Sequence, residues 1–146
     1  MKLSTRSRYG TRLMLDIARN SNEGPVRIND IATRQEISVK YLEQLIIPLK
    51  KAVYIKSVRG PKGGHLLGKA KEEITVGGIV RVLEKDTGLV PCVERSDTCH
   101  KSDACVTRNL WLKATDAVYE ILDSVTLLDL IQDNNSQEDG DGETKG

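Results

Sequence analysis

Three cysteines lie in one polar stretch of the chain, and thiolates are strong ligands for zinc and for iron. Cys92, Cys99 and Cys105 are separated by six and five residues. This spacing lacks the Cys-x-x-Cys pair that is typical of structural zinc modules, whereas iron-sulfur clusters accept wider and family-specific spacings. We therefore predict metal binding, with an iron-sulfur cluster as the first hypothesis. The alternative is three unrelated surface thiols, one of which could be redox-active.

A cluster held by three thiolates needs a fourth ligand from another residue. The same stretch offers His100, Asp97, Asp103 and Glu94. The imidazole of His100 is chemically the best candidate, although a lone histidine in a loop is more often only solvated. A ligand other than a thiolate alters the reduction potential of a cluster and attaches it less firmly, which suits a sensor.

A second set of residues has the chemistry to contact DNA. A helix predicted to begin after Ser38 carries Lys40, Tyr41 and Gln44 on the face away from its leucine stripe. An amide side chain such as Gln44 can read base edges, while Lys40 and Tyr41 suit phosphate or groove contacts. Glu43 would repel phosphate, so a Glu43 that faces DNA would accept a hydrogen bond from a cytosine amino group. The candidate recognition surface consists of five residues, which are Ser38, Lys40, Tyr41, Glu43 and Gln44.

A basic, glycine-rich hairpin follows this helix. Apolar residues alternate on both sides of residues 60–64, whose sequence is GPKGG, and this pattern predicts two short strands around a tight turn. Arg59 and Lys62 are placed to enter a minor groove, which attracts arginine where it is narrow. A helical hairpin with solvated charges followed by a plain turn would give the same pattern. The hairpin together with the surplus of basic residues favours DNA binding.

Charge divides the chain into two halves of opposite sign. Residues 1–71 contain 15 basic and 5 acidic side chains, and residues 72–146 contain 7 and 16, for an overall formal charge of +1. The basic half suits a phosphate-rich partner, so we expect double-stranded DNA. No apolar run approaches the roughly 20 residues needed to span a bilayer, and the first residues do not resemble a signal peptide. We expect a cytoplasmic protein without a membrane partner.

The elements that must position these residues follow from apolar periodicity and capping residues. We expect a first helix over residues 5–20, a short second helix capped by Asn29 and a third helix capped by Ser38. A fourth helix, near residues 76–83, is expected to be capped by Thr75. Two helices joined by a short turn, with a hairpin behind them, make a winged helix-turn-helix.

The second half of the chain is expected to hold the metal and to form a dimer. Residues 86–107 lack a regular pattern, and an amphipathic helix is predicted from about residue 107 to residue 125. The predicted fold is mainly α with a small β-hairpin wing, a winged helix-turn-helix plus a long C-terminal dimerisation helix. We divide the chain into a DNA-binding region (1–71), a cluster loop with dimerisation helices (72–131) and a disordered acidic tail (132–146).

A dimer of such chains would place two recognition helices about one DNA turn apart on a near-palindromic site. No serine, histidine or acidic residue falls in a catalytic nucleophile motif, so we do not expect an enzyme. A small redox enzyme that uses the same cysteines is the competing hypothesis, and it predicts substrate turnover without DNA affinity.

Four parts of the chain resemble the IscR-type iron-sulfur cluster regulators, over roughly residues 1–131. They are LSTRSRY (residues 3–9), YLEQL (41–45), VRGPKGG (58–64), and the three-cysteine stretch followed by NLW (109–111).

This resemblance implies a homodimer that binds a 2Fe-2S cluster through Cys92, Cys99 and Cys105 and controls iron-sulfur assembly genes. Regulators of this type can use a histidine three positions after the last cysteine as fourth ligand, and this chain has Arg108 at that position. The fourth ligand therefore stays open, with His100 as the candidate.

The chain also resembles the CymR-type repressors of cysteine metabolism, in Trp111, in DAV at residues 116–118 and in LDS at residues 122–124. Repressors of that type work without a cluster and through a partner enzyme of cysteine synthesis. A repressor that senses nitric oxide is a third member of the same group. The three-cysteine stretch favours the cluster-binding type.

Overall fold

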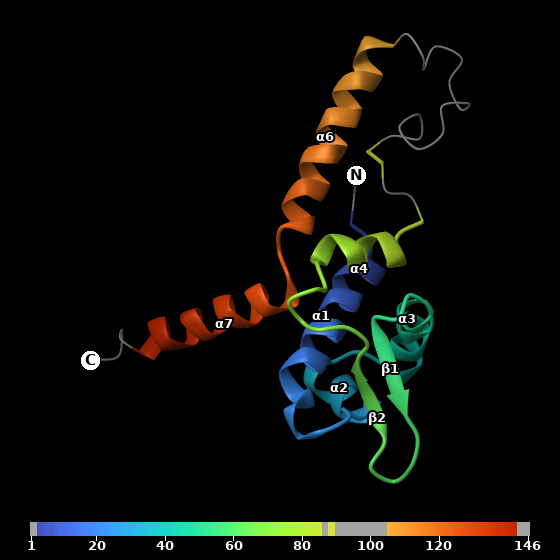
Figure 1. The fold of residues 1–146 in the computed structure, drawn as a ribbon, viewed down its shortest axis with the longest axis vertical. Coiled ribbons are helices and arrows are strands. Elements are labelled where there is room, and N and C mark those ends of the chain that lie inside the picture. Colours follow the sequence, from blue (N-terminus) through green and yellow to red (C-terminus); the bar gives the residue numbers. More distant parts are fainter. Residues whose placement is uncertain (1–2, 86–87, 90–104, 143–146) are drawn as a thin grey trace.

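The computed structural model describes residues 3–85, 88–89 and 105–142. Short helices and one hairpin form a head, from which a long helix rises and a last helix projects to the side (Figure 1). The described elements confirm a mainly α fold with a small β-hairpin. The helices are α1 (Thr5–Asn20), the 3-10 helix η1 (Ser21–Glu23), α2 (Ile28–Gln35), α3 (Val39–Lys51), α4 (Val76–Leu83), α6 (Val106–Asp123) and α7 (Leu127–Gly142), and the strands are β1 (Ile55–Val58) and β2 (Gly64–Leu67).

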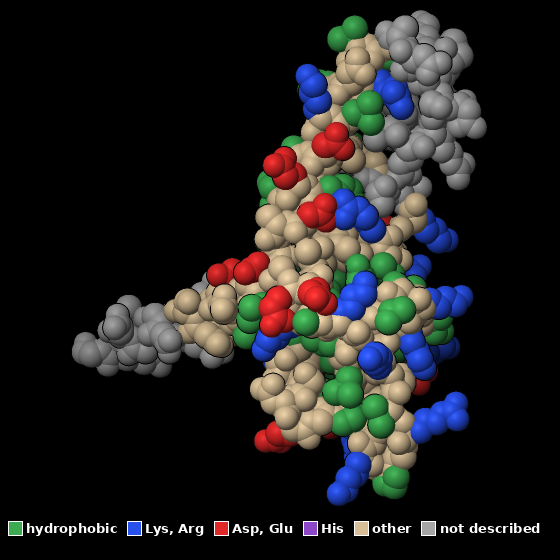
Figure 2. All heavy atoms as spheres, viewed as in Figure 1, with side chains coloured by type: hydrophobic (Ala, Val, Ile, Leu, Met, Phe, Trp, Pro, Cys, Tyr) green, Lys and Arg blue, Asp and Glu red, His purple; other side chains and the backbone are tan. Residues whose placement is uncertain are grey.

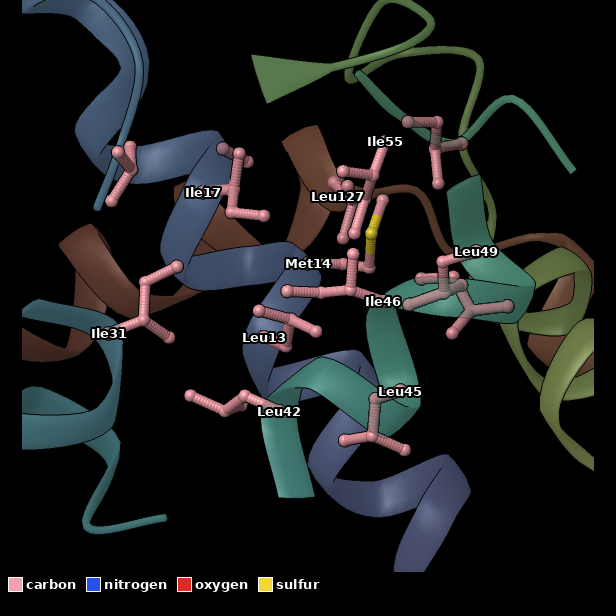
Figure 3. Packing of buried hydrophobic residues seen from close by; sticks show 14 of the residues in the cluster. Leu13, Met14, Ile17, Ile31, Leu42, Leu45, Ile46, Leu49, Ile55 and Leu127 are labelled. Carbon is pink, nitrogen blue, oxygen red and sulfur yellow. The ribbon is translucent and has the colours of Figure 1, made fainter. Parts of the chain in front are cut away.

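The core of the head is built from the apolar stripes that the sequence periodicity predicts. Helix α1 lies at its centre, and its buried side chains meet those of α3 (Figure 3). Each fully buried Leu, Ile or Met contributes about 1.5–3 kcal/mol relative to an exposed one, so the packing of α1 on α3 fixes the predicted recognition helix to the head. The buried residues include Leu13, Met14, Ile17, Ile31, Leu42, Leu45, Leu49, Ile55 and Leu127.

The turn between α2 and α3 is short and closely specified. Glu36 ends α2 in the left-handed conformation, with a φ of 55°, and Ile37 is buried beneath the turn. Ser38 then caps α3 as predicted, because its hydroxyl oxygen accepts a hydrogen bond from the amide of Tyr41 at 3.2 Å. The first turn of α3 is therefore anchored at Ser38.

Helix α2 begins before its predicted cap. Its N-cap is Arg27, which makes no side-chain capping bond, so the prediction that Asn29 caps this helix is wrong. The start is fixed instead by the neighbouring Val26, which is buried and forms a bridge with His65 of β2. The two residues exchange backbone hydrogen bonds of 2.9 and 2.8 Å.

Strands β1 and β2 form the predicted wing. They pair antiparallel, with Val58 opposite Gly64 at the tip. The amide of Gly63 donates to the carbonyl of Gly60 at 2.9 Å, and the φ of Gly60 is 116°, a region that favours glycine. A Cβ on Gly63 would lie 2.2 Å from the carbonyl oxygen of Val58. Glycine is therefore required at both positions of the turn.

The connection between α6 and α7 is tied to the start of α4. Thr75 caps α4 as predicted. The amide of Val76 donates to the carbonyl of Val125 at 2.8 Å, and the amide of Leu127 donates to that of Ile74 at 3.0 Å. The side chain of Leu127 is fully buried in the core of the head. Helices α6 and α7 are thus joined to the body that carries the wing.

The structure differs from the prediction of a disordered tail, because residues 132–142 continue helix α7. The amide of Thr126 donates to the carboxylate of Asp129 at 2.9 Å, and the amide of Asp129 donates back to the Thr126 hydroxyl at 3.1 Å. This reciprocal pair is a capping box, and the burial of Leu127 anchors the turn that follows it. The prediction of disorder rested on the acidic, glycine-bearing composition of the segment and did not use the Thr-x-x-Asp spacing.

Candidate DNA interface and metal-binding segment

One side of α3 is polar and exposed. Ser38, Lys40, Glu43 and Gln44 are exposed there, whereas the leucines of the same helix are buried. The structure thus places four of the five predicted recognition residues on an accessible surface. The carboxylate, amide and ammonium groups at these positions together supply acceptors and donors for base edges and phosphates.

Tyr41 has a different environment from its four neighbours on α3. It is only partly exposed and packs against the core. Its ring meets that of Tyr9 edge to face, with centroids 5.9 Å apart and an interplanar angle of 84°. Tyr41 therefore holds α3 against α1, a contact between distant residues that the sequence did not predict.

The wing presents its basic residues to the outside. Arg59 and Lys62 are both exposed at the tip. Arg27, which the sequence analysis did not single out, is also exposed and donates from its guanidinium to the carbonyl of Pro61 in the tip at 2.5 Å. Figure 2 shows Lys and Arg side chains over the head and the wing, and Asp and Glu side chains along α6 towards α7. On this face both signs of charge occur along α6, whereas the wing carries Lys and Arg side chains.

A buried carboxylate holds the helix-turn-helix to α1. The side chain of Asp16 is 2% exposed, and its two oxygens accept from Arg34 at 2.7 and 3.0 Å. The amide of Gln35 donates to the same carboxylate at 2.8 Å. The hydrogen bond to Asp16 raises the pKa of Arg34 above its usual value. A signal was present in the sequence, since Asp16 interrupts the apolar face formed by Leu13 and Ile17.

A second carboxylate joins the end of α4 to the start of α1. Glu84 is the C-cap of α4, and one of its oxygens accepts from the amide of Ser4 at 2.9 Å, from the Ser4 hydroxyl at 2.7 Å and from the Ser7 hydroxyl at 2.5 Å. Ser4 is also the N-cap of α1. Burial opposes ionisation of Glu84, but the hydrogen bonds from Ser7 and Ser4 outweigh it, and the pKa of Glu84 is lowered.

The lowered pKa of Glu84 predicts a stability contribution that depends on pH. A carboxylate with a lower pKa in the folded state stabilises the fold above its unfolded pKa, and this contribution is lost as the pH falls through the folded pKa. Glu84→Gln should therefore cost about 1 kcal/mol at pH 7 and much less near pH 3. Urea unfolding at both pH values measures this difference. Glu72→Gln, an exposed control, should show no such dependence, and equal losses for Glu84→Gln at both pH values would contradict the prediction.

Cys105 is the only one of the three cysteines within the described residues. It is the N-cap of α6 and is partly exposed. Its Sγ lies 3.0 Å from the hydroxyl oxygen of Thr107. Hydrogen bonds with Thr107 and with the backbone amide of Arg108 lower the pKa of the thiol, which favours the thiolate that binds metals. This position suits a metal ligand.

Cys92, Cys99 and His100 lie outside the described residues. Among residues 3–85, 88–89 and 105–142, no three His, Cys, Asp or Glu side chains are grouped so that they could hold a metal ion.

Helix α6 carries large apolar side chains that the described chain leaves uncovered. Val106, Leu110, Trp111 and Ile121 are 81%, 55%, 39% and 66% exposed. The side of the helix that faces α4 buries Thr115 and Tyr119, and Trp111 lies one turn before Thr115 in the same row. In the part of the chain that the structure describes, no helix combines the length and apolar character needed to cross a membrane.

A helix-turn-helix followed by a β-hairpin wing and a long helix defines the class of winged-helix transcription regulators. The chain belongs to the Rrf2 family, described as iron-dependent transcriptional regulators, whose family model matches residues 3–133. Members of this family are transcription regulators and not enzymes, which confirms that part of the sequence prediction.

Individual relatives include both types of regulator that the sequence resembles. The chain is 50% identical over 133 residues to Protein rrf2 of Nitratidesulfovibrio vulgaris. The aligned residues cover 91% of this chain and 89% of that protein. The solved structure of T. potens IscR matches with a TM-score of 0.76 and 40% identity, over 92% of this chain and 88% of that one. The structure of CymR, the global cysteine regulator of B. subtilis, matches with a TM-score of 0.74 and 42% identity, over 89% and 95%.

Proposed function

We propose that this chain acts as a homodimer that binds a near-palindromic operator in double-stranded DNA and represses or activates transcription there. The observation that carries this proposal is the exposed polar face of α3 beside a basic wing, both fixed to one buried core. Gln44 and Glu43 would read base edges in the major groove, and Lys40 would contact phosphate. Arg59 and Lys62 of the wing would enter the adjacent minor groove.

The exposed apolar residues of α6 support a dimer. Leu110 and Ile121 lie on the side of α6 that does not face α4, and a second copy of the same helix would cover them. Pairing along α6 would place the two DNA-binding regions, residues 1–71 of each chain, on opposite ends of the assembly. Residues 72–131 would then combine the cysteine segment with the dimer contact.

We further propose that Cys92, Cys99 and Cys105 hold a 2Fe-2S cluster, with the fourth ligand open and His100 as candidate. The donor set fits, because three thiols lie in one segment and Cys105 is accessible at the start of α6. The description of the family as iron-dependent supports the same assignment. A bound cluster supplies one-electron redox chemistry and an iron site sensitive to small molecules. On this proposal the regulated genes are those of iron-sulfur assembly.

A cluster-free repressor of cysteine metabolism that acts with a partner enzyme is the second candidate, favoured by the match to CymR. The two candidate functions predict different absorption spectra for the purified protein. Protein purified without oxygen, or reconstituted with iron and sulfide, should absorb visible light on the cluster proposal. A colourless protein after reconstitution would leave the cluster-free repressor. An additional response to nitric oxide would identify the third, NO-sensing type.

Gln44→Ala tests the proposed reading of DNA by α3. The duplex that the wild-type protein selects from a random-sequence library serves as the probe. The variant should bind this duplex more weakly by about 1–3 kcal/mol, and it should tolerate changes at one base pair in each half-site. Gel-shift titrations with the selected duplex and its single-base variants measure both effects. Gln132→Ala is the matched control, because Gln132 is an exposed amide on α7, outside the helix-turn-helix and the wing. If Gln44→Ala bound as the wild type and kept the same base preference, α3 would not be the reading helix.

A further inference from the structure

Arg12 of α1 forms hydrogen bonds with the end of α2, at the turn of the helix-turn-helix. Its Nε donates to the side-chain oxygen of Gln35 at 3.0 Å, and its Nη2 donates to the Gln35 carbonyl at 2.5 Å. Gln35 is the last residue of α2, where the backbone carbonyls have no partner within the helix. One guanidinium thus holds both the side chain and the backbone at the point where α2 ends.

The same guanidinium also reaches α3 through an aromatic pair. The Cζ of Arg12 lies over the ring of Tyr9, 5.2 Å from its centroid. Tyr9 in turn meets Tyr41 of α3 edge to face. Arg12 therefore contacts the turn directly and the recognition helix through Tyr9. Tyr41 is the neighbour of Lys40 and lies three residues before Gln44.

The packing around this pair is incomplete on one side. A hollow of about 440 Å³ is lined by Thr5, Tyr9 and Tyr41, and by the turn residues Glu36, Ile37 and Ser38. Apolar packing from this side does not fill the space next to the first turn of α3. Buried Leu42 holds the inner side of that turn, so on the side of the hollow the turn is held by directional contacts, and Arg12 makes contacts of this kind.

We propose that Arg12 is a positioning residue for DNA recognition, which fixes the α2–α3 turn and the first turn of α3 without contacting DNA itself. This inference rests on the proposed function, in which α3 reads the operator. Lysine is a poor substitute on this account, because an ammonium group lacks the planar fork that donates to two oxygens of Gln35 while lying over Tyr9.

The competing role for Arg12 is a direct phosphate contact, since its side chain is exposed and positively charged. The two roles predict different results. A phosphate contact depends on charge, is largely kept by lysine, and contributes about one unit to the slope of log affinity against log salt. A positioning role depends on geometry and is specific for the operator.

The test compares Arg12→Lys, Arg12→Ala and Arg19→Ala, the last of which removes an exposed positive charge in the last turn of α1. Affinities are measured at several salt concentrations for the selected duplex and for a shuffled duplex of the same composition. Both Arg12 variants should bind the selected duplex about 3- to 30-fold more weakly, with an unchanged salt slope. Arg12→Lys should bind the shuffled duplex as the wild type does, and Arg19→Ala should keep the preference for the selected duplex.

Backbone amide chemical shifts of residues 38–44 provide a second readout that does not depend on DNA. They should move in Arg12→Lys and stay in place in Arg19→Ala, while circular dichroism shows that both variants are folded. The proposal is overturned if Arg12→Lys keeps wild-type affinity, or if Arg12→Ala weakens binding to both duplexes equally and lowers the salt slope. If Gln44→Ala also leaves affinity unchanged, the proposed function fails. If only the Arg12 variants are without effect, the positioning role alone fails.

Discussion

Replacing Asp16 with alanine should lower the free energy of unfolding by about 2–4 kcal/mol. The carboxylate is almost fully buried and accepts four hydrogen bonds, two from Arg34, one from Gln35 and a longer one from the side-chain amide of Asn20 at 3.4 Å. Its loss leaves the amide of Gln35 without its acceptor and removes the ionic link between α1 and the end of α2. Because the side chain of Arg34 is 40% exposed, water can solvate its guanidinium, so the loss should stay below that of a fully buried ion pair.

Denaturant unfolding measures this effect, with Glu23→Ala as the control. Glu23 is an exposed acidic residue at the end of η1, and its replacement should change stability by less than about 0.5 kcal/mol. Asp16→Asn should fall between the two, because the amide keeps the shape but has one oxygen in place of two. If Asp16→Ala and Glu23→Ala had the same free energy of unfolding, the hydrogen bonds of Asp16 would not hold the helix-turn-helix in place.

Ile121→Glu should dissociate the proposed dimer. Ile121 is two-thirds exposed in the single chain, and pairing along α6 would bury it. A carboxylate without a partner in an apolar interface costs several kcal/mol, which corresponds to an increase of about 100-fold or more in the dimer dissociation constant. Sedimentation velocity over a range of concentrations measures this constant. Affinity for a two-half-site duplex should fall as well, because each half-site is then bound separately.

Asn109→Glu is the matched control for Ile121→Glu. It introduces the same charge into the same helix at an exposed polar position, outside the apolar surface formed by Leu110 and Ile121. It should leave the dimer intact. A dimer that survived Ile121→Glu as well would mean that α6 is not the dimer contact.

Much of the head could be predicted from the sequence because its signals are local. The apolar period of α3 and the glycines of the wing identified the elements that carry Lys40, Gln44 and Arg59. The caps at Ser38 and Thr75 set helix starts within a few residues, since a capping hydroxyl acts only on the next turn. Apolar periodicity, turn glycines and capping residues can be recognised in the sequence without knowledge of the fold.

The contacts that lock these elements together could not be predicted in the same way. Arg12 with Gln35, Arg34 with Asp16, and Glu84 with Ser4 join residues that are 18 to 80 positions apart. Such pairs depend on how helices pack, and a single sequence does not reveal their partners. The helical course of α7 was not predicted for another reason, because the prediction rested on the acidic, glycine-bearing composition of residues 132–146.

The most direct test of the central claim is the affinity of the full-length dimer for its selected duplex, measured without oxygen, with and without the reconstituted cluster. A variant in which Cys92, Cys99 and Cys105 are all replaced by alanine is measured in parallel. Coupling between two sites is typically 5- to 150-fold in affinity. We predict a change of at least about fivefold on cluster loading for the wild type, and no change for the triple variant. Equal affinity for both forms of the wild type would contradict the account.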